Sequence, residues 1–157
     1  MNNHKVKCSN FEIANNKPFT LIAGPCQLES EEHAIKISNE LKKITSELGV
    51  NLIYKTSFDK ANRTSLKGKR GAGLDSSLPV FDKIKKELNV PILTDIHNIN
   101  QCSEVADHVD VLQIPAFLCR QTDLLIAAAK TNKIINVKKG QFLAPVSYTH
   151  LRAHETG

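Results

Sequence analysis

Two lysines stand at or near the ends of short apolar runs of the kind that form buried strands. Lys55 lies near the end of the apolar run 51–57, and Lys138 ends another apolar run, 134–138. A buried ammonium without a partner is costly, so each lysine needs an anion. The pattern predicts a site for phosphate or carboxylate groups. In the alternative interpretation, each lysine extends its amine to water or pairs with a carboxylate of the core.

A carboxylate and an imidazole stand at the end of a third apolar run, 91–96. Asp95 and His97 are two residues apart, and side chains at this spacing project to the same face of a strand. Together they can move protons or orient a sugar. The alternative is that Asp95 caps the following helix and His97 is a turn residue.

A polar, glycine-bearing loop over about 58–74 follows the run 51–57. The side chains with ligand chemistry at its start are Ser57, Lys60, Asn62 and Arg63. A guanidinium can grip a phosphate through two hydrogen bonds, and an amide can bind a sugar hydroxyl or an aldehyde oxygen. Loop residues of these types are often only solvated. The stretch 68–73 lacks the spacing of a P-loop or a dinucleotide fingerprint.

The spacing of the cysteines predicts reduced thiols and no disulfide. Cys8, Cys26, Cys102 and Cys119 form no C-x-x-C pair, so we exclude a zinc ribbon and a thioredoxin-type motif and expect reduced thiols. The thiolate of Cys26, which follows the first apolar run, can bind a divalent transition metal. A lone cysteine is more often a small buried apolar residue.

Short apolar runs alternate with longer amphipathic segments, which predicts strands alternating with helices. The predicted strands are 19–24, 51–57, 91–96, 110–114 and 134–138. The predicted helices are 30–48, with a cap at Ser30, then 75–88, 101–107 and 121–130.

Strict alternation indicates parallel strands joined by right-handed crossovers, in a doubly wound sheet or a barrel. Polar residues at the strand ends, without a G-x-G-x-x-G after the first strand, favour the (β/α)8 TIM barrel. A complete barrel has eight strands in about 250 residues. We therefore expect a partial barrel of five strands and four helices in a single domain over 1–145. The stretch 146–157 lacks either periodicity, and we interpret it as a foreign tail.

Composition narrows the class of partner. The formal net charge of +5 suits an anionic partner. Aromatic residues make up 5% and Trp is absent, which disfavours nucleic acid. No stretch approaches the ~20 apolar residues of a membrane span, and no signal peptide is recognisable. We expect a cytoplasmic protein that binds small anions.

Five segments carry a family resemblance. They read AGPC (23–26), YKTSFDKANRTS (54–65), TDIH (94–97), QIPAFL (113–118) and NVKKGQF (136–142). In density and order, over about 11–145, they resemble the 3-deoxy-D-manno-octulosonate 8-phosphate synthases. The KANRTS segment is the specific part, because the sister heptulosonate 7-phosphate synthases have a different, shorter pattern there.

The resemblance implies a transferase that condenses phosphoenolpyruvate with D-arabinose 5-phosphate and water, in lipopolysaccharide biosynthesis. It implies that phosphoenolpyruvate binds at Lys55, Lys60 and Lys138. Arabinose 5-phosphate would bind at Asn62 and Arg63. The implied catalytic residues are Lys60, Asn62, Asp95 and His97, and the remaining substrate-binding residues are Ser57, Gln113, Pro115 and Ala116.

The resemblance also implies a metal and an oligomer. A cysteine at position 26 is typical of the metal-dependent branch, in which Cys26 would bind zinc, iron or manganese. The other ligands of the family come from later strands, which we do not expect here, and His150, His154 and Glu155 do not inherit those roles. The family is tetrameric with an N-terminal hairpin, which would fall in about 8–18.

Three alternatives stay open. The chain can belong to a heptulosonate 7-phosphate synthase, or to an aldolase in which a strand-end lysine forms a Schiff base. The third alternative is a truncated, non-catalytic fragment. Five strands of an eight-stranded barrel leave two open edges, which favour aggregation.

Overall fold

A parallel sheet with helices on its outer face forms the body of the molecule. The structure is a computed structural model, and it describes residues 4–61 and 65–144. The strands of the sheet, in spatial order, are β3 (Thr20–Ala23), β4 (Asn51–Lys55), β5 (Ile92–Asp95), β6 (Val111–Ile114) and β7 (Ile134–Val137). Every neighbouring pair is parallel and consecutive in the chain. The predicted α/β partial barrel is confirmed as a five-stranded half-barrel.

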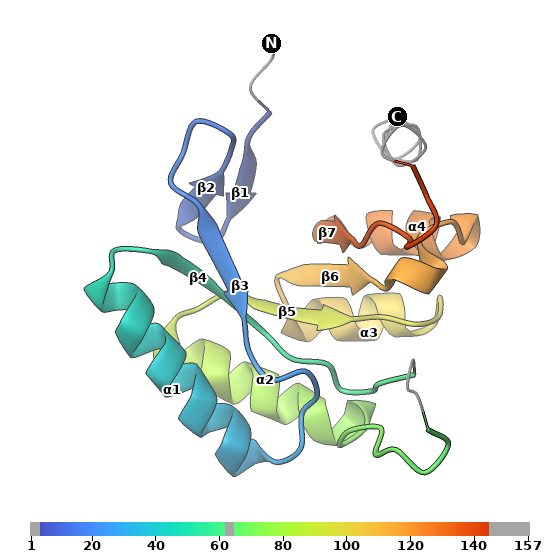
Figure 1. Ribbon diagram of the computed structural model, residues 1–157, viewed down its shortest axis with the longest axis horizontal. Helices are drawn as coiled ribbons and strands as arrows, with labels where there is room; N and C mark the ends of the chain where they lie inside the picture. The colour runs from blue at the N-terminus through green and yellow to red at the C-terminus, as the bar shows by residue number, and fades with distance from the viewer. Residues whose placement is uncertain (1–3, 62–64, 145–157) are drawn as a thin grey trace.

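Each crossover between strands contains a helix. The helices are α1 (Glu31–Glu47), α2 (Leu74–Leu88), α3 (Gln101–His108) and α4 (Thr122–Ala129), and a short 3-10 helix, η1 (Ala116–Leu118), precedes α4. The Ser30 hydroxyl accepts a hydrogen bond from His33 N at 3.2 Å, so the predicted cap of α1 is confirmed. Figure 1 shows α1 and α2 side by side and α3 behind β5 and β6.

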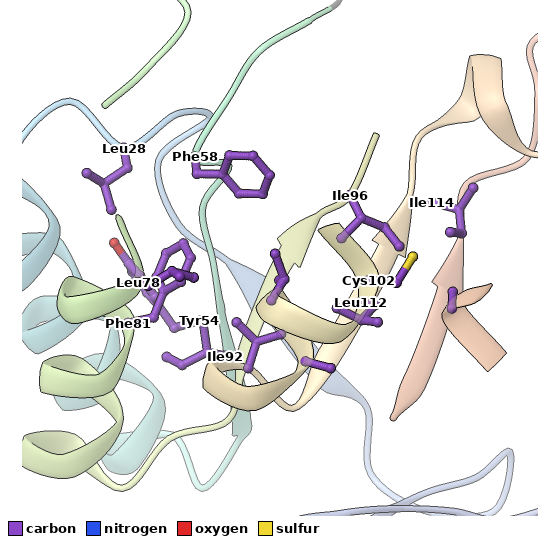
Figure 2. Close-up of a cluster of buried hydrophobic side chains, with 14 of the residues drawn as sticks. Leu28, Tyr54, Phe58, Leu78, Phe81, Ile92, Ile96, Cys102, Leu112 and Ile114 are labelled. Carbon is purple, nitrogen blue, oxygen red and sulfur yellow. The ribbon is translucent and has the colours of Figure 1, made fainter. Parts of the chain in front are cut away.

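The main core lies between the helices and the outer face of the sheet. This cluster includes Tyr54, Ile92 and Leu112 from the strands and Phe81 from α2 (Figure 2). All four are fully buried. Burial of a large apolar side chain stabilises the fold by roughly 1.5–3 kcal/mol, so this layer holds the helices against the strands.

A second, smaller core closes the N-terminal end of the half-barrel. Strands β1 (Val6–Cys8) and β2 (Phe11–Ile13) form an antiparallel hairpin. Its residues Cys8, Phe11 and Ile13 pack on the inner face of the sheet, against Ile53, Leu93, Val111 and Ile134. The inner face is therefore filled at one end.

The N-terminal hairpin predicted at about 8–18 is confirmed, with an error in its bounds, because its strands begin at Val6 and end at Ile13. Cys8 and Phe11 pair across the turn, and Val6 pairs with Ile13. Ser9 lies in the turn with φ of 51°, a left-handed conformation that polar turn residues tolerate. Strands of three residues are too short for a clear alternation, which explains the error.

Two predictions lie outside the described residues. These are the positions of Asn62 and Arg63 and the foreign tail over 146–157. Elsewhere the predicted and observed elements differ by one or two residues at their ends; β4, for example, ends at Lys55 and not at 57. Among the described residues, no helix is both long and apolar enough to cross a membrane.

Candidate active site

A cavity of about 540 Å³ lies at the carboxyl ends of the strands. Lys55, Asp95 and Lys138 reach it from β4, β5 and the end of β7, and η1 forms a further part of its wall. Two other hollows, of about 590 and 660 Å³, lie between α3 and α4 and beside the hairpin. Neither of those contains a predicted site residue, so the chemistry gathers at the carboxyl ends.

Lys55 and Asp95 meet on one wall of this cavity. Lys55 Nζ donates to Ser57 Oγ at 3.0 Å and lies 3.8 Å from Asp95 Oδ2. The Ser57 hydroxyl donates to the same carboxylate oxygen. Lys55 was expected either to bind an anionic ligand or to pair with a carboxylate of the protein. The structure shows it beside the Asp95 carboxylate, and both side chains line the cavity. Asp95 does not cap α3, which begins after Asn100.

Two amides continue this hydrogen-bonded chain across the sheet. Gln113 Nε2 donates to Asp95 Oδ1, and Asn136 Nδ2 donates to Gln113 Oε1 at 2.8 Å. Gln113 is buried and is not one of the residues that line the cavity, and its amide contacts Asp95 instead of facing the opening. Its predicted contact with substrate stays a prediction. Sequence analysis assigned no role to Asn136. The signal was present, since Asn136 precedes Lys138 by two positions and so faces the same side of the strand.

Cys26 and Lys60 meet on the other side of the cavity. The Lys60 ammonium donates to Cys26 Sγ, although 34 positions separate the two residues. This hydrogen bond is the main reason why the pKa of the Cys26 thiol lies below its ordinary value, and burial opposes it. Cys26 is exposed, whereas Cys8, Cys102 and Cys119 are buried. The structure therefore gives Cys26 the chemistry of a reactive, thiolate-forming side chain.

The described residues do not complete a metal site around Cys26. Within 4–61 and 65–144, no group of three or more His, Cys, Asp or Glu side chains could hold one ion. The thiol instead faces the Lys60 ammonium, which carries the charge of a cation. Fewer than three such donors around Cys26 do not complete the tetrahedral or octahedral ligand set that a transition metal takes in a stable protein site.

His97 lies deeper in the same wall. Its ring packs edge-on against Phe58, with the ring centroids 5.7 Å apart, and its backbone N–H donates to Gln101 Oε1 at 2.8 Å. The Nδ1 atom is buried and has no hydrogen-bond partner among the described residues. Burial lowers the pKa of His97, and the nearby Asp95 and Asp59 carboxylates oppose this only in part. At neutral pH the ring is therefore a neutral imidazole.

The loop that carries Lys60 is closed at its base by a charged pair. Arg70 Nε donates to Asp59 Oδ1 at 2.7 Å, and Arg70 Nη2 donates to the other carboxylate oxygen. Lys60 N donates to Arg70 O at 2.6 Å. The two ends of the segment 59–70 are thereby held together, and the Lys60 side chain is directed toward Cys26. The Asp59–Arg70 pair was not predicted, because nothing in the spacing of the two residues indicates it.

A glycine allows the ends of β3 and β4 to meet at the rim of the cavity. Gly24 has φ of 156°, and a Cβ atom placed on it would lie 1.9 Å from Lys55 O. No other residue fits there without moving one of the strands. The close approach of the β3 end to Lys55 helps to determine where the Lys55 ammonium stands.

Most of the predicted site residues are brought together. The cavity is lined by Cys26, Lys55, Ser57, Lys60, Asp95, His97, Pro115, Ala116 and Lys138. Asn62 and Arg63 lie outside the described residues. The lining residues that sequence analysis missed are Asp59, Ala61, Phe117, Leu118 and Gln141. Phe117 is 61% exposed and gives the wall an apolar part.

This arrangement can bind a ligand with several negative charges. Three ammonium groups, those of Lys55, Lys60 and Lys138, border one cavity, and the Asp95 carboxylate lies 3.8 Å from the ammonium of Lys55. The carboxylate of Asp95 and the neutral imidazole of His97 can orient hydroxyl groups or move a proton. The cavity thus combines electrostatic stabilisation with acid–base groups.

Comparison with known proteins extends these findings. The model of the DAHP synthetase I family matches residues 3–155. A protein from Chelativorans sp. is 64% identical over 143 residues, which are 91% of this chain and 52% of that protein. A protein from Mesorhizobium japonicum is 59% identical over 155 residues, or 99% of this chain and 56% of the relative. One from Brucella anthropi is 62% identical over 143 residues, again 91% and 52%.

All three relatives bear the name 2-dehydro-3-deoxyphosphooctonate aldolase. The chain spans about half the length of these relatives. The 155 residues that the Mesorhizobium japonicum relative matches, 99% of this chain, include the cavity described above, with the three lysines, Asp95 and His97.

Proposed function

This chain belongs to the DAHP synthetase I family, and on that premise we propose that it forms part of a 3-deoxy-D-manno-octulosonate 8-phosphate synthase. The reaction is the condensation of phosphoenolpyruvate with D-arabinose 5-phosphate and water, which yields the eight-carbon sugar acid phosphate and inorganic phosphate. The product serves lipopolysaccharide biosynthesis. The names of the three relatives support the octulosonate reaction over the heptulosonate one.

One observation carries the proposal, namely the gathering of Lys55, Lys60 and Lys138 around a single cavity at the strand ends. Phosphoenolpyruvate has a carboxylate and a phosphate, and the sugar has a second phosphate. Binding both substrates at once requires several cations from different elements. Lysines from β4, the loop after β4 and the end of β7 meet this requirement.

In the proposed reaction, C3 of phosphoenolpyruvate forms a bond to the aldehyde carbon of the sugar. The aldehyde oxygen takes up a proton and becomes a hydroxyl group. The oxygen of water bonds to C2 and loses one proton, which balances the proton taken up by the aldehyde oxygen. The C2–O bond to phosphate then breaks, the remaining proton on the C2 hydroxyl leaves with the phosphate, and the products are the C2 ketone and inorganic phosphate. Charge builds up on the phosphate and carboxylate groups, and fixed ammonium groups stabilise it.

We assign the residues by what surrounds them. Lys55, Lys60 and Lys138 hold the anionic groups of phosphoenolpyruvate. Asp95 and His97 meet the sugar, where a fixed carboxylate accepts hydrogen bonds from hydroxyl groups and a neutral imidazole hydrogen-bonds to the aldehyde oxygen. Asn62 and Arg63 retain the role that the resemblance implies, at the sugar phosphate.

A Schiff base is a poorer account of these lysines. Lys55 Nζ donates to Ser57 Oγ and stands 3.8 Å from the Asp95 carboxylate, so attack of this nitrogen on a carbonyl carbon would require it to leave both partners. The Lys60 amine likewise faces a thiol that it helps to ionise. We therefore assign electrostatic roles to both.

We propose Cys26 as the contribution of this chain to a divalent transition-metal site, and we assign no step of the reaction to the metal. A direct test is the absorbance of a cobalt–thiolate bond when Co²⁺ is added. The band is expected for a chain extended to full barrel length and not for its Cys26→Ser variant. An identical band in the variant would exclude Cys26 as a ligand.

The proposed reaction also leads to proposals about the location and the oligomeric state of the enzyme. An enzyme that uses small phosphorylated substrates for a precursor belongs in the cytoplasm, and we propose that the full-length protein forms a homotetramer. Sedimentation of the extended protein tests the oligomer. A monomer at working concentration would contradict it.

The test of function is phosphate release from phosphoenolpyruvate, measured with D-arabinose 5-phosphate and, separately, with D-erythrose 4-phosphate. It compares this chain with an extended chain, in which the C-terminal half of the Chelativorans relative continues it. Each is assayed with added metal and with a chelator. We expect turnover with the five-carbon sugar in the extended chain.

Each other outcome selects an alternative. Preference for the four-carbon sugar indicates a heptulosonate 7-phosphate synthase. Covalent trapping of a keto acid by borohydride indicates a Schiff base. No turnover in a folded extended chain rejects the synthase, and turnover only in the extended chain shows that the 157 residues alone are non-catalytic.

A further inference from the structure

A row of three polar side chains crosses β5, β6 and β7 beside the cavity. The register pairs Asp95 with Gln113 and Gln113 with Asn136, so the three lie at matching positions on neighbouring strands. Asn136 Nδ2 donates to Gln113 Oε1 at 2.8 Å, and Gln113 Nε2 donates to Asp95 Oδ1. Only Asp95 lines the cavity. The row thus connects Asp95, which lines the cavity, to β7, the second strand from β5 in the sheet.

The carboxylate determines the direction of the hydrogen bonds in this row. An ionised carboxylate only accepts hydrogen bonds, so Gln113 must turn its NH₂ group toward Asp95. The carbonyl oxygen of Gln113 then faces β7, where Asn136 Nδ2 is the donor it meets. Gln113 is 5% exposed, so water replaces this donor poorly and the reversed amide would leave a buried group unsatisfied.

The other oxygen of Asp95 is held from a different part of the molecule. The Ser57 hydroxyl donates to Oδ2, and the Lys55 ammonium stands 3.8 Å from the same atom. The carboxylate is therefore anchored at both oxygens. The anchor at Oδ2 comes from β4 and its following loop, whereas the anchor at Oδ1 depends on Asn136 through Gln113.

We infer that Asn136 is a positioning residue which, through the Gln113 amide, sets the direction in which Asp95 meets the pentose phosphate. The inference rests on the proposed function, because it takes the sugar as the ligand of Asp95. If the row only joined the strands, a substitution at Asn136 would change the free energy of unfolding and leave substrate recognition unchanged. A positioning row also changes recognition of the sugar, and leaves recognition of phosphoenolpyruvate nearly unchanged.

The variant Asn136→Asp isolates this role. It keeps the size of the side chain but replaces the donor by an acceptor, so that Gln113 faces a carboxylate on either side and its NH₂ group satisfies one of them. The matched control is Asn132→Asp. Asn132 is exposed and has φ of 57° in the turn before β7, where Asp is tolerated.

The first measurement is made on the 157-residue chain and needs no turnover. The side-chain NH₂ signals of Gln113 are assigned by NMR from their absence in Gln113→Leu. We expect them to shift and to exchange faster with solvent in Asn136→Asp, and to be unchanged in Asn132→Asp. Unchanged Gln113 signals in a folded Asn136→Asp chain would overturn the inference.

The second measurement is made on the extended chain with both substrates. For Asn136→Asp we expect kcat/KM for arabinose 5-phosphate to fall about 10- to 100-fold, while KM for phosphoenolpyruvate stays within about twofold. A positioning role in sugar recognition would be rejected if kcat/KM for arabinose 5-phosphate did not fall. It would also be rejected if KM for phosphoenolpyruvate rose by as large a factor as kcat/KM for arabinose 5-phosphate fell. If wild type itself shows no turnover, the proposed function fails, and the NMR signals still decide whether Asn136 orients Gln113.

A further variant guards against a folding failure of Asn136→Asp. Asn136→Leu removes the donor without adding charge, and we expect a smaller loss of the same kind. In a Gln113→Leu background, Asn136→Leu should cause no further loss, because its effect passes through the amide. Additive losses would show that Asn136 acts by another route and would overturn the inference.

Discussion

The two ends of the half-barrel interior differ in chemistry although the same four strands build both. At the N-terminal end, Ile53, Leu93, Val111 and Ile134 pack against the hairpin. Two positions further along each strand, on the same face, stand Lys55, Asp95, Gln113 and Asn136. The inner face thus changes from apolar to polar in a single step on every one of these strands.

This difference separates stability from chemistry. The apolar end is covered by β1 and β2, which exclude water from it. The polar end opens into the cavity, and its side chains satisfy one another through hydrogen bonds. Barrel enzymes place active sites at the carboxyl ends of their strands, and here the change of residue type along each strand provides the physical basis.

The largest expected effect is on turnover at the polar end. Lys55→Met removes the ammonium beside Asp95, and we expect kcat/KM of the extended chain to fall at least about 100-fold, equivalent to about 3 kcal/mol. The free energy of unfolding should change by less than about 1 kcal/mol, since Asp95 keeps its two hydrogen-bond donors. The control Lys7→Met, on β1, should leave turnover unchanged. Similar turnover losses in both variants would break the comparison.

The apolar end should respond in the opposite way. Leu93 is fully buried against the hairpin, and Leu93→Ala should lower the free energy of unfolding by about 3 kcal/mol through lost contacts and a cavity. Leu48, which is 70% exposed, provides the control Leu48→Ala, with an expected change below about 0.5 kcal/mol. Urea unfolding measures both. A Leu93→Ala chain as stable as the control would mean that the hairpin does not close this end.

The buried thiol of Cys8, at the apolar end, should make the free energy of unfolding depend on pH. Burial is the main cause that raises the pKa of Cys8 to about 11, from an ordinary 9.0. The folded state then holds the proton more tightly than the unfolded state, so the contribution is complete below pH 9 and is lost as pH rises to about 11.

Replacing that thiol isolates its contribution. Between pH 8.5 and 11, wild type should lose about 2 kcal/mol more unfolding free energy than Cys8→Val. The Tyr54 hydroxyl, whose pKa is raised to about 12 by burial, is present in both chains and cancels in the difference. Parallel pH profiles for the two chains would contradict a buried Cys8 thiol.

The smallest effect concerns the thiol at the polar end. Cys26 is exposed and its pKa is lowered, first by the hydrogen bond from Lys60. Iodoacetamide at pH 7.5 should therefore modify Cys26 before the three buried cysteines. Lys60→Met should slow this reaction about three- to tenfold, because less thiolate is present. Peptide mass spectrometry follows each site, Lys7→Met is the control, and an unchanged rate in Lys60→Met would reject the contact.

Much of the fold could be predicted because its signals are local. Each strand is a short apolar run and each helix has an amphipathic period, so their order and approximate ends follow from nearby residues. The hairpin was placed too late because three-residue strands have almost no period. At the site, Lys55, Asp95, His97 and Lys138 were identifiable from residue type and position at a strand end.

The partners of these side chains were not predictable. Ser57 and Asp95 are 38 positions apart, and Cys26 and Lys60 are 34 apart. The Asp59–Arg70 pair and the Asn136 amide have no sequence signal for their partners. Such contacts depend on which strands are neighbours and in what register.

By itself, the amino-acid sequence determined that strands and helices alternate, that one face of four strands changes from apolar to polar, and which residue types stand at the strand ends. Only the tertiary structure decided that the hairpin covers the apolar end, that Lys55 shares Asp95 with Ser57, and that Asn136 reaches Asp95 through Gln113. The physical reason is that periodicity is a property of one segment. A hydrogen bond across a sheet requires two or more segments to be aligned in space.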